Sequence, residues 1–374
     1  MKGAEAGAVR AAEDGGARGA GAVRRGEELD LAAVDAFLKP RVPGLAGSPR
    51  VTQYAGGASN WTYRLEYPSH DLVLRRPPAG TKAKSAHDMG REFRVQAALG
   101  PFFPYVPEMV AFCDDPSVLG CEFYVMRRIA GVIPRANLPK GIVLTPDEAR
   151  RMCLSVLDRL VDLHRVDANA AGLAALGKGA GYCRRQVDGW TDRYAKARTW
   201  NVPRFARVTN WLKANTPDDV ATCVIHNDFR LDNVVLDPDD ATRVVGILDW
   251  EMATLGDPLM DLGNSLAYWV EAGDDFVIRS MRRQPTHLPG MLTRREVVAA
   301  YFERSGLPAR DVTFYEVYGL FRLAVIAQQI YFRYHRGETR NPAFRRFWIL
   351  AHYLQWRCGR LIRSFTDPLI RNRE

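Results

Sequence analysis

The sequence has few cysteines and no long apolar run, and both absences exclude classes of protein. Its six cysteines are scattered without a Cys-x-x-Cys pair, so their spacing indicates neither a zinc site nor a disulfide framework. No segment offers about 18 uninterrupted apolar residues, and the N-terminus lacks an apolar signal core. We therefore expect reduced thiols, no membrane span and a cytoplasmic location.

Aromatic residues are missing from the first stretch of the chain. Residues 1–27 are mostly Ala, Gly, Arg and Glu and cannot bury enough apolar surface to offset the entropy of ordering, which predicts a disordered tail. A mitochondrial transit peptide is the competing interpretation. The acidic residues Glu5, Glu13, Asp14 and Glu27 count against it, because such peptides avoid acids.

Positive charge is unevenly distributed along the chain. The net charge is +9, and residues 271–374 alone hold 18 Arg and Lys against 10 Asp and Glu, a surplus of eight. A solvated, arginine-rich helical surface is one interpretation, and a surface that attracts an anionic ligand is the other. No recognition motif accompanies the charge, so we do not expect nucleic-acid binding.

The residues best suited to catalysis and metal binding lie in two segments, His226 to Asn233 and Ile247 to Glu251. A turn at 237–240 joins two apolar runs, which predicts a hairpin that brings Asn233 and Asp249 to the same end of adjacent strands. An amide and a carboxylate oxygen at one place suit Mg²⁺, a hard cation. Asp228 would then face the hydroxyl that accepts a phosphoryl group.

These motifs resemble the aminoglycoside phosphotransferase family, distant relatives of protein kinases. The resemblance rests on His-x-Asp-x4-Asn at 226–233, Leu-Asp-Trp-Glu at 248–251 and Gly-Asp-Pro-Leu-Met-Asp-Leu at 256–262. The motifs are similar to those of the branch of this family that is associated with acyl-CoA dehydrogenases. The resemblance implies an α+β, protein kinase-like fold with a small antiparallel-sheet lobe at 28–130 and a larger, mainly helical lobe at 131–374, and it implies ATP and Mg²⁺ as cofactors.

The spacing of apolar and turn residues predicts the elements of both lobes. Strands are expected at 51–54, 62–67, 72–76, 109–113 and 122–126, with a helix at 87–99. Helices of the second lobe are expected at 145–164, 182–197, 204–214, 259–270, 293–305, 311–333 and 343–363. The first of these has a capping box, Thr145 with Glu148.

The nucleotide is expected in the cleft between the lobes. The loop around Gly56 and Gly57 lacks the Walker pattern, so it would bring backbone amides to the phosphates between two strands. The same loop includes Ser59 and Asn60, and adenine is expected to meet backbone groups around Met126 and Arg128.

The third strand presents an arginine where a kinase-like strand would ordinarily present lysine. Arg75 is our candidate for the phosphate contact, with Arg76 as the alternative register. A guanidinium is a permanent cation that binds phosphate in a forked geometry, so function could survive the change. Glu92 is the expected carboxylate partner of this arginine.

Each candidate residue of the catalytic segment has a chemical and a structural interpretation. Asp228 is expected to be the base, and Asn233 and Asp249 the metal ligands, although each also fits a loop residue. His226 is assigned by the resemblance to holding the catalytic loop. Arg230 either meets substrate or phosphate or is a solvated loop residue. A pseudokinase that binds nucleotide or a partner without turnover is the alternative function.

The sequence does not name the acceptor, a small molecule. Aminoglycosides are polycations and would need an acidic pocket, whereas the second lobe has the basic surplus, which favours an anionic acceptor. The resemblance suggests a hydroxyacyl group on coenzyme A, with an aminoglycoside kinase as the alternative. The candidate phosphate-binding arginines are Arg282, Arg283, Arg294 and Arg295. The candidate acyl-pocket residues are Trp269, Phe314, Tyr315 and Tyr331, although their helical spacing favours a core position for each.

Overall fold

Strands with alternating apolar residues build the first lobe. Tyr63 and Leu65 of one strand are fully buried, while Thr62 and Arg64, which alternate with them, lie on the other face. The structure, a computed structural model, describes residues 20–54, 60–78 and 88–366. It contains an antiparallel sheet in the order β1-β2-β3-β4-β6-β5. The strands are β1 (Ala20–Gly21), β2 (Arg50–Tyr54), β3 (Trp61–Glu66), β4 (Asp71–Arg76), β5 (Met109–Cys113) and β6 (Phe123–Arg127).

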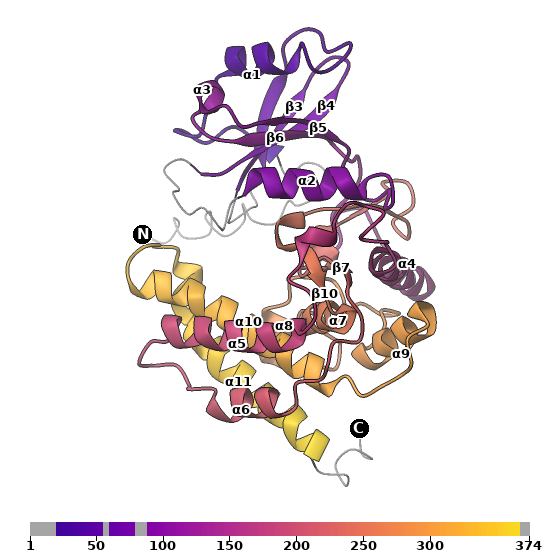
Figure 1. The fold of residues 1–374 in the computed structure, drawn as a ribbon, viewed down its shortest axis with the longest axis vertical. Coiled ribbons are helices and arrows are strands. Elements are labelled where there is room, and N and C mark those ends of the chain that lie inside the picture. Colours follow the sequence, from indigo (N-terminus) through magenta and orange to yellow (C-terminus); the bar gives the residue numbers. More distant parts are fainter. Residues whose placement is uncertain (1–19, 55–59, 79–87, 367–374) are drawn as a thin grey trace, which may run out of the picture.

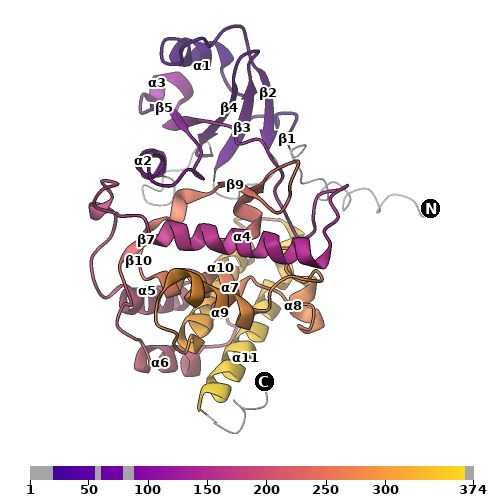
Figure 2. The same cartoon turned by 90° about the vertical axis from the view of Figure 1, so that its right-hand side faces the viewer.

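Helices lie on both sides of this sheet, as Figures 1 and 2 show. The helix α2 lies below the sheet and faces the second lobe, while α1 lies at the far end. All five predicted strands are confirmed to within one residue, and the predicted helix at 87–99 is confirmed as α2. Helix α1 was not predicted. The bounds are α1 (Leu31–Leu38), α2 (Met89–Leu99) and α3 (Pro116–Leu119).

The second lobe is mainly helical. Its long first helix begins with the predicted capping box, in which the Thr145 hydroxyl accepts from the Glu148 N–H and the Glu148 carboxylate accepts from the Thr145 N–H. The helices are α4 (Pro146–His164), α5 (Tyr182–Ala197), α6 (Ala206–Ala214), α7 (Pro258–Ala267), α8 (Phe276–Ser280), α9 (Arg294–Ser305), α10 (Thr313–His335) and α11 (Phe347–Thr366). Two short antiparallel pairs lie beneath the first lobe: β7 (Cys223–Ile225) with β10 (Thr254–Gly256), and β8 (Val234–Leu236) with β9 (Val244–Ile247).

Two glycines allow α7 and α10 to touch through their backbones. A Cβ atom on Gly319 would lie 2.1 Å from the Gly263 carbonyl oxygen, and one on Gly263 would lie 2.3 Å from the Tyr315 carbonyl oxygen. The two helix backbones can approach this closely only because glycine has a hydrogen atom for a side chain at both positions. The contact fixes α7, which begins directly after the catalytic segment, against the longest helix of the lobe.

The expected disordered tail is wrong for its last residues. Residues 20–27 hold strand β1, and their side chains and backbone bond to the sheet: Arg24 N–H donates to Gln53 at 2.9 Å, and the Tyr63 hydroxyl donates to the Glu27 carbonyl at 2.7 Å. Composition suggested disorder because this stretch has little apolar surface, but hydrogen bonds to the strands order it instead. Residues 1–19 lie outside the described part.

Among the described residues, no helix combines the length and the apolar character needed to cross a membrane.

Candidate active site

The β8–β9 hairpin places Asn233 and Asp249 together. Val234 pairs with Ile247, and the Leu248 N–H donates to the Asn233 carbonyl oxygen at 2.8 Å, so the two candidate ligands flank the same end of the hairpin. The apolar side chains of both strands are buried and hold this register. The sequence predicted this arrangement correctly.

Asp228 is held beside Asn233 by two donors. The Asn233 amide nitrogen lies 3.1 Å from the Asp228 carboxylate and 2.8 Å from its backbone oxygen, and an Arg230 guanidinium nitrogen lies 3.1 Å from the same carboxylate. Because the amide nitrogen is committed to Asp228, the amide oxygen of Asn233 is the atom available to a cation. Arg230 also stacks on Tyr268, 4.4 Å from its ring centre.

His226 supports the loop and does not reach toward an acceptor. It is completely buried, its Nδ1 accepts from the Asp228 N–H at 3.2 Å, and its Nε2 lies 3.0 Å from the Leu248 carbonyl oxygen. These contacts require the proton on Nε2. The imidazole ring of His226 therefore connects the loop that contains Asp228 to the residue that precedes Asp249.

A buried carboxylate anchors the same loop from below. Asp261 of α7 accepts the N–H groups of His226 and Asn227, each at 2.8 Å, and lies 3.2 Å from His164 Nε2. Burial would raise the pKa of Asp261, but the hydrogen bonds from His164 and the loop lower it overall. Three donors thus hold the Asp261 carboxylate between α4 and this loop.

Arg75 connects the first lobe to the hairpin. One guanidinium nitrogen lies 2.8 Å from the Glu92 carboxylate of α2, and the other lies 2.9 Å from Asp249 and 3.3 Å from Glu251. Burial raises the pKa of Glu92, and Arg75 only partly offsets this. Burial also acts to raise the pKa of Asp249, but the charge and hydrogen bond of Arg75, together with His226 and Arg230, lower it overall. Asp249 itself has a positive φ of 70°, a conformation that non-glycine residues adopt at a cost and that clusters at functional sites.

Arg76 faces the opposite side of the sheet. Its guanidinium stacks on Trp61 at 4.9 Å and reaches the carbonyl oxygens of Glu27 and Glu28. Neighbouring strand residues point to opposite faces, so only one of the two arginines can meet the cleft. The alternative register for the phosphate contact is therefore wrong.

The expected nucleotide residues are only partly described. Gly56, Gly57 and Ser59 lie outside the described residues, while Asn60 is buried and donates to Glu251 at 3.4 Å. Met126 pairs with Val73 inside the sheet, where both side chains are nearly buried.

Arg128 differs from expectation in one respect. Its backbone N–H donates to the Asp71 carbonyl oxygen at 2.9 Å, and its side chain pairs with the Asp71 carboxylate at 2.6 Å. The backbone N–H of Arg128 is therefore already used, and its carbonyl oxygen is the backbone group left to meet adenine.

Sequence reasoning missed the residue that connects α2 to the loop that follows Asp249. The Arg91 guanidinium donates to the Glu251 carbonyl at 3.1 Å and to the Ala253 carbonyl. A basic residue next to Glu92 was the only signal available. This bond pins the backbone just after Asp249 to the helix that presents Glu92.

The residues suggested for an acyl pocket belong to the core. Trp269 donates to the Leu292 carbonyl, and it lines a cavity of only about 20 Å³ behind the catalytic loop, room for roughly one water. Tyr331 bonds to Asn201, and Phe314 and Tyr315 are buried.

The suggested phosphate arginines are also partly committed. Arg294 forms two bonds to the Asp274 carboxylate, at 2.7 and 3.0 Å, and Arg282 donates to Ala136 and Asn137. Arg283 and Arg295 are exposed. Neither acyl pocket nor phosphate cluster is formed by these residues as a group.

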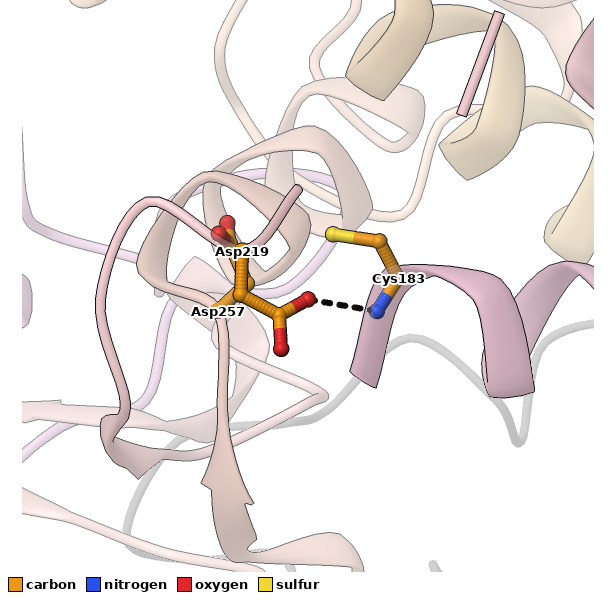
Figure 3. Close-up of side chains that lie close together, drawn as sticks. All are labelled: Cys183, Asp219 and Asp257. Atoms are coloured by element: carbon orange, nitrogen blue, oxygen red, sulfur yellow. Dashed lines mark hydrogen bonds between the residues drawn. The ribbon is translucent and has the colours of Figure 1, made fainter. Parts of the chain in front are cut away.

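A second cluster of candidate ligands has a structural explanation. Cys183, Asp219 and Asp257 lie close together (Figure 3), with ligand atoms within 4.8 Å of one another. Asp219 accepts the N–H groups that open α5, including Cys183 at 2.9 Å, and Asp257 accepts those that open α7. Burial and both carboxylates raise the pKa of the Cys183 thiol, so it stays protonated and is a poor ligand. The cluster is a pair of helix caps.

The arrangement of the lobes and loops defines the fold class of the protein. A six-stranded antiparallel sheet with helix α2 against it, joined to a helical lobe that bears a His-x-Asp loop and an Asp after a short hairpin, is the protein kinase-like fold. Among solved structures, a putative aminoglycoside phosphotransferase from Ralstonia eutropha superposes with a TM-score of 0.74 at 30% identity, over 89% of this chain and 99% of that one. A choline kinase from Cryptosporidium parvum shares the fold at a TM-score of 0.61 and 12% identity, over 91% and 98%.

The family follows from the sequence comparisons. Residues 50–297 match the phosphotransferase enzyme family, and the chain belongs to this family. Acyl-CoA dehydrogenase family member 11 of Rattus norvegicus is 36% identical over 83% of this chain and 40% of its own length. The probable acyl-CoA dehydrogenase IBR3 of Arabidopsis thaliana is 33% identical, over 85% and 40%. The chain therefore spans less than half the length of these curated relatives.

Proposed function

We propose that the protein transfers the γ-phosphoryl group of ATP to a hydroxyl of a small, anionic molecule. The observation that carries the proposal is the joint placement of Asp228, Asn233 and Asp249. Asn233 donates to Asp228 at 3.1 Å while sharing the end of a hairpin with Asp249, so a base and two oxygen ligands converge from one short segment.

Each residue has a part in this reaction. Asp228 would orient the acceptor hydroxyl and take its proton as the oxygen attacks, and Arg230 would hold the Asp228 carboxylate in place. Asn233 and Asp249 would hold Mg²⁺, which supplies charge neutralisation on the phosphates when bound. Arg75, positioned by Glu92, would meet the phosphate oxygens in the forked geometry that guanidinium permits. A related solved structure, of a thermostable mutant of aminoglycoside phosphotransferase APH(4)-Ia, was determined with AMP-PNP and hygromycin B, which supports nucleotide binding by this fold.

An anionic acceptor is supported by the charge of the second lobe. Residues 271–374 hold 18 basic against 10 acidic residues, the opposite of what a polycationic aminoglycoside needs. The match to proteins named for acyl-CoA dehydrogenases supports a hydroxyacyl compound as the acceptor.

The test is an ATP-consumption screen with product detection. Hydroxyacyl-CoAs, free hydroxy acids, aminoglycosides and choline-like alcohols would each be offered at low and moderate salt, with Asp228→Asn as the inactive control. Mg²⁺-dependent phosphorylation of an acidic acceptor supports the proposal. Turnover restricted to a cationic aminoglycoside would refute the anionic acceptor and leave the kinase proposal intact.

A nucleotide-binding module without turnover is the second candidate. The bond between Arg75 and Asp249 favours it, because a guanidinium on the metal-ligand carboxylate competes with a cation for that oxygen. Thermal stabilisation by Mg²⁺ and ATP without any phosphorylated product would make this the better proposal.

A further inference from the structure

One buried arginine of the second lobe has no acidic partner. Arg322 of α10 is only 4% exposed, yet among the described residues no carboxylate lies within salt-bridge distance of it and it donates no hydrogen bond. Its guanidinium lies over the face of Trp190 on α5, 5.1 Å from the ring centre. Leaving a charge buried without a counterion is costly, so such a residue in a folded protein calls for a ligand or another explanation.

The position of Arg322 relates it to the candidate active site. Helix α10 packs against both α7 and α5, and the three helices lie side by side in Figure 1. Tyr268 ends α7 and stacks on Arg230, which in turn bonds to Asp228 at 3.1 Å. Burial raises the pKa of the Tyr268 phenol, the charge of Asp228 raises it further, and Arg230 and Arg322 lower it. The charges of Asp228 and Arg322 therefore act on the same tyrosine.

The surroundings of Arg322 suit a small acidic molecule. Its guanidinium faces the aromatic ring of Trp190, and its charge lowers the pKa of the Tyr182 and Tyr318 phenols against the larger effect of burial. Tyr182 donates to Asn227, the residue before Asp228, at 3.0 Å. A guanidinium in such surroundings forms strong, charge-assisted bonds to an oxyanion because little water competes.

We propose that Arg322 binds the oxyanion of the acceptor while the acceptor hydroxyl lies at Asp228. The inference rests on the proposed function and adds the residue that selects for negative charge. The oxyanion is the carboxylate of a short hydroxy acid or a phosphate of a larger carrier, and both present the same oxygen acceptors to the guanidinium.

The experiment compares Arg322→Met with a matched control on the same ring. Arg193 also stacks on Trp190, at 4.6 Å, but is exposed to solvent. Arg193→Met should therefore leave acceptor use unchanged. The acceptors are 3-hydroxybutyrate, its neutral amide and its coenzyme A thioester, each titrated with saturating Mg²⁺ and ATP.

In Arg322→Met the KM for the acidic acceptor should rise about 10- to 100-fold, while the KM for the amide and the affinity for Mg²⁺ and ATP stay unchanged. A rise confined to the thioester would assign the oxyanion to the carrier phosphates. Equal effects on acid and amide, or no effect on any acceptor, would overturn the inference.

Direct calorimetric binding of 3-hydroxybutyrate and of its thioester separates this inference from the kinase proposal. Should no acceptor be phosphorylated by the unaltered protein, the proposed function fails, while binding that depends on Arg322 still supports the anion site. Absence of binding to the unaltered protein overturns it. The melting temperature is an independent readout: removing a buried, unpaired charge should hold or raise it in Arg322→Met, which also shows that the variant folds.

Discussion

A guanidinium nitrogen of Arg75 lies 2.9 Å from the carboxylate of Asp249, so the residue in the place of the usual lysine already contacts the candidate metal ligand. The other nitrogen of the fork holds Glu92 at 2.8 Å. One side chain thus links the sheet, α2 and the β8–β9 hairpin. A lysine has a single ammonium and cannot hold both carboxylates in this geometry.

Removing this fork should affect both stability and nucleotide affinity. Arg75→Met leaves Glu92 buried without its cation, which should cost about 3–5 kcal/mol in the free energy of unfolding. Arg75→Lys should lose less, because it keeps one charge near Glu92. Urea denaturation and titration with Mg²⁺ and ATP measure the two effects. Arg76→Met is the control, since Arg76 faces away from the cleft: nucleotide affinity equal in the two methionine variants would show that Arg75 does not contact phosphate.

The two acidic residues of the catalytic segment should differ in what they control. Asp228→Asn should lower kcat by about 10²- to 10⁴-fold with nearly unchanged nucleotide affinity, because it removes proton acceptance at the acceptor. Asp249→Ala should weaken binding of Mg²⁺ and ATP about 10-fold or more. Steady-state kinetics and calorimetry separate these effects, with Asp239→Asn in the exposed β8–β9 turn as the control. Retained turnover in Asp228→Asn would contradict the role of the base.

Local spacing explains why much of this site was predictable. Asp228, Asn233 and Asp249 lie within one loop and one hairpin, so turn residues and two apolar runs sufficed to place them together. The choice between Arg75 and Arg76 remained open, because a shift of one residue reverses the face and only the packed sheet fixes the register.

Long-range contacts account for what was missed. The bond from Arg91 to the Glu251 carbonyl joins residues 160 positions apart, and no periodicity reveals it. Strand β1 was missed because its stability comes from pairing with Gln53 and Tyr54 and not from its own composition. Arg322 is one of two arginines on a mostly apolar helix, and only its burial without a carboxylate partner distinguishes it.

The close approach of α7 and α10 predicts a severe effect of one methyl group. Gly319→Ala would place a Cβ atom 2.1 Å from the Gly263 carbonyl oxygen, so the helices must separate. We expect a loss of about 1–3 kcal/mol or more, despite the better helix propensity of alanine. Gly189→Ala in α5 is the control, because no atom lies within 4 Å of the added methyl, and it should gain up to about 1 kcal/mol. Equal melting temperatures in the two variants would contradict the packing argument.

Glu316 should make stability fall as pH rises. Its pKa is raised to about 7, chiefly by burial and also by Asp311 and Glu271, while Arg294 and Arg357 offset the rise only in part. A carboxyl group whose pKa is higher in the folded state stabilises the fold while protonated, so its contribution is complete below the unfolded pKa near 4.5 and is lost as pH rises through about 7. Glu316→Gln should therefore be more stable than the unaltered protein at pH 8, by at most about 3 kcal/mol, with little difference at pH 5. Urea denaturation across this range tests the prediction, with Glu303→Gln on the exposed face of α9 as the control. A difference that does not depend on pH would show that ionisation of Glu316 is not its cause.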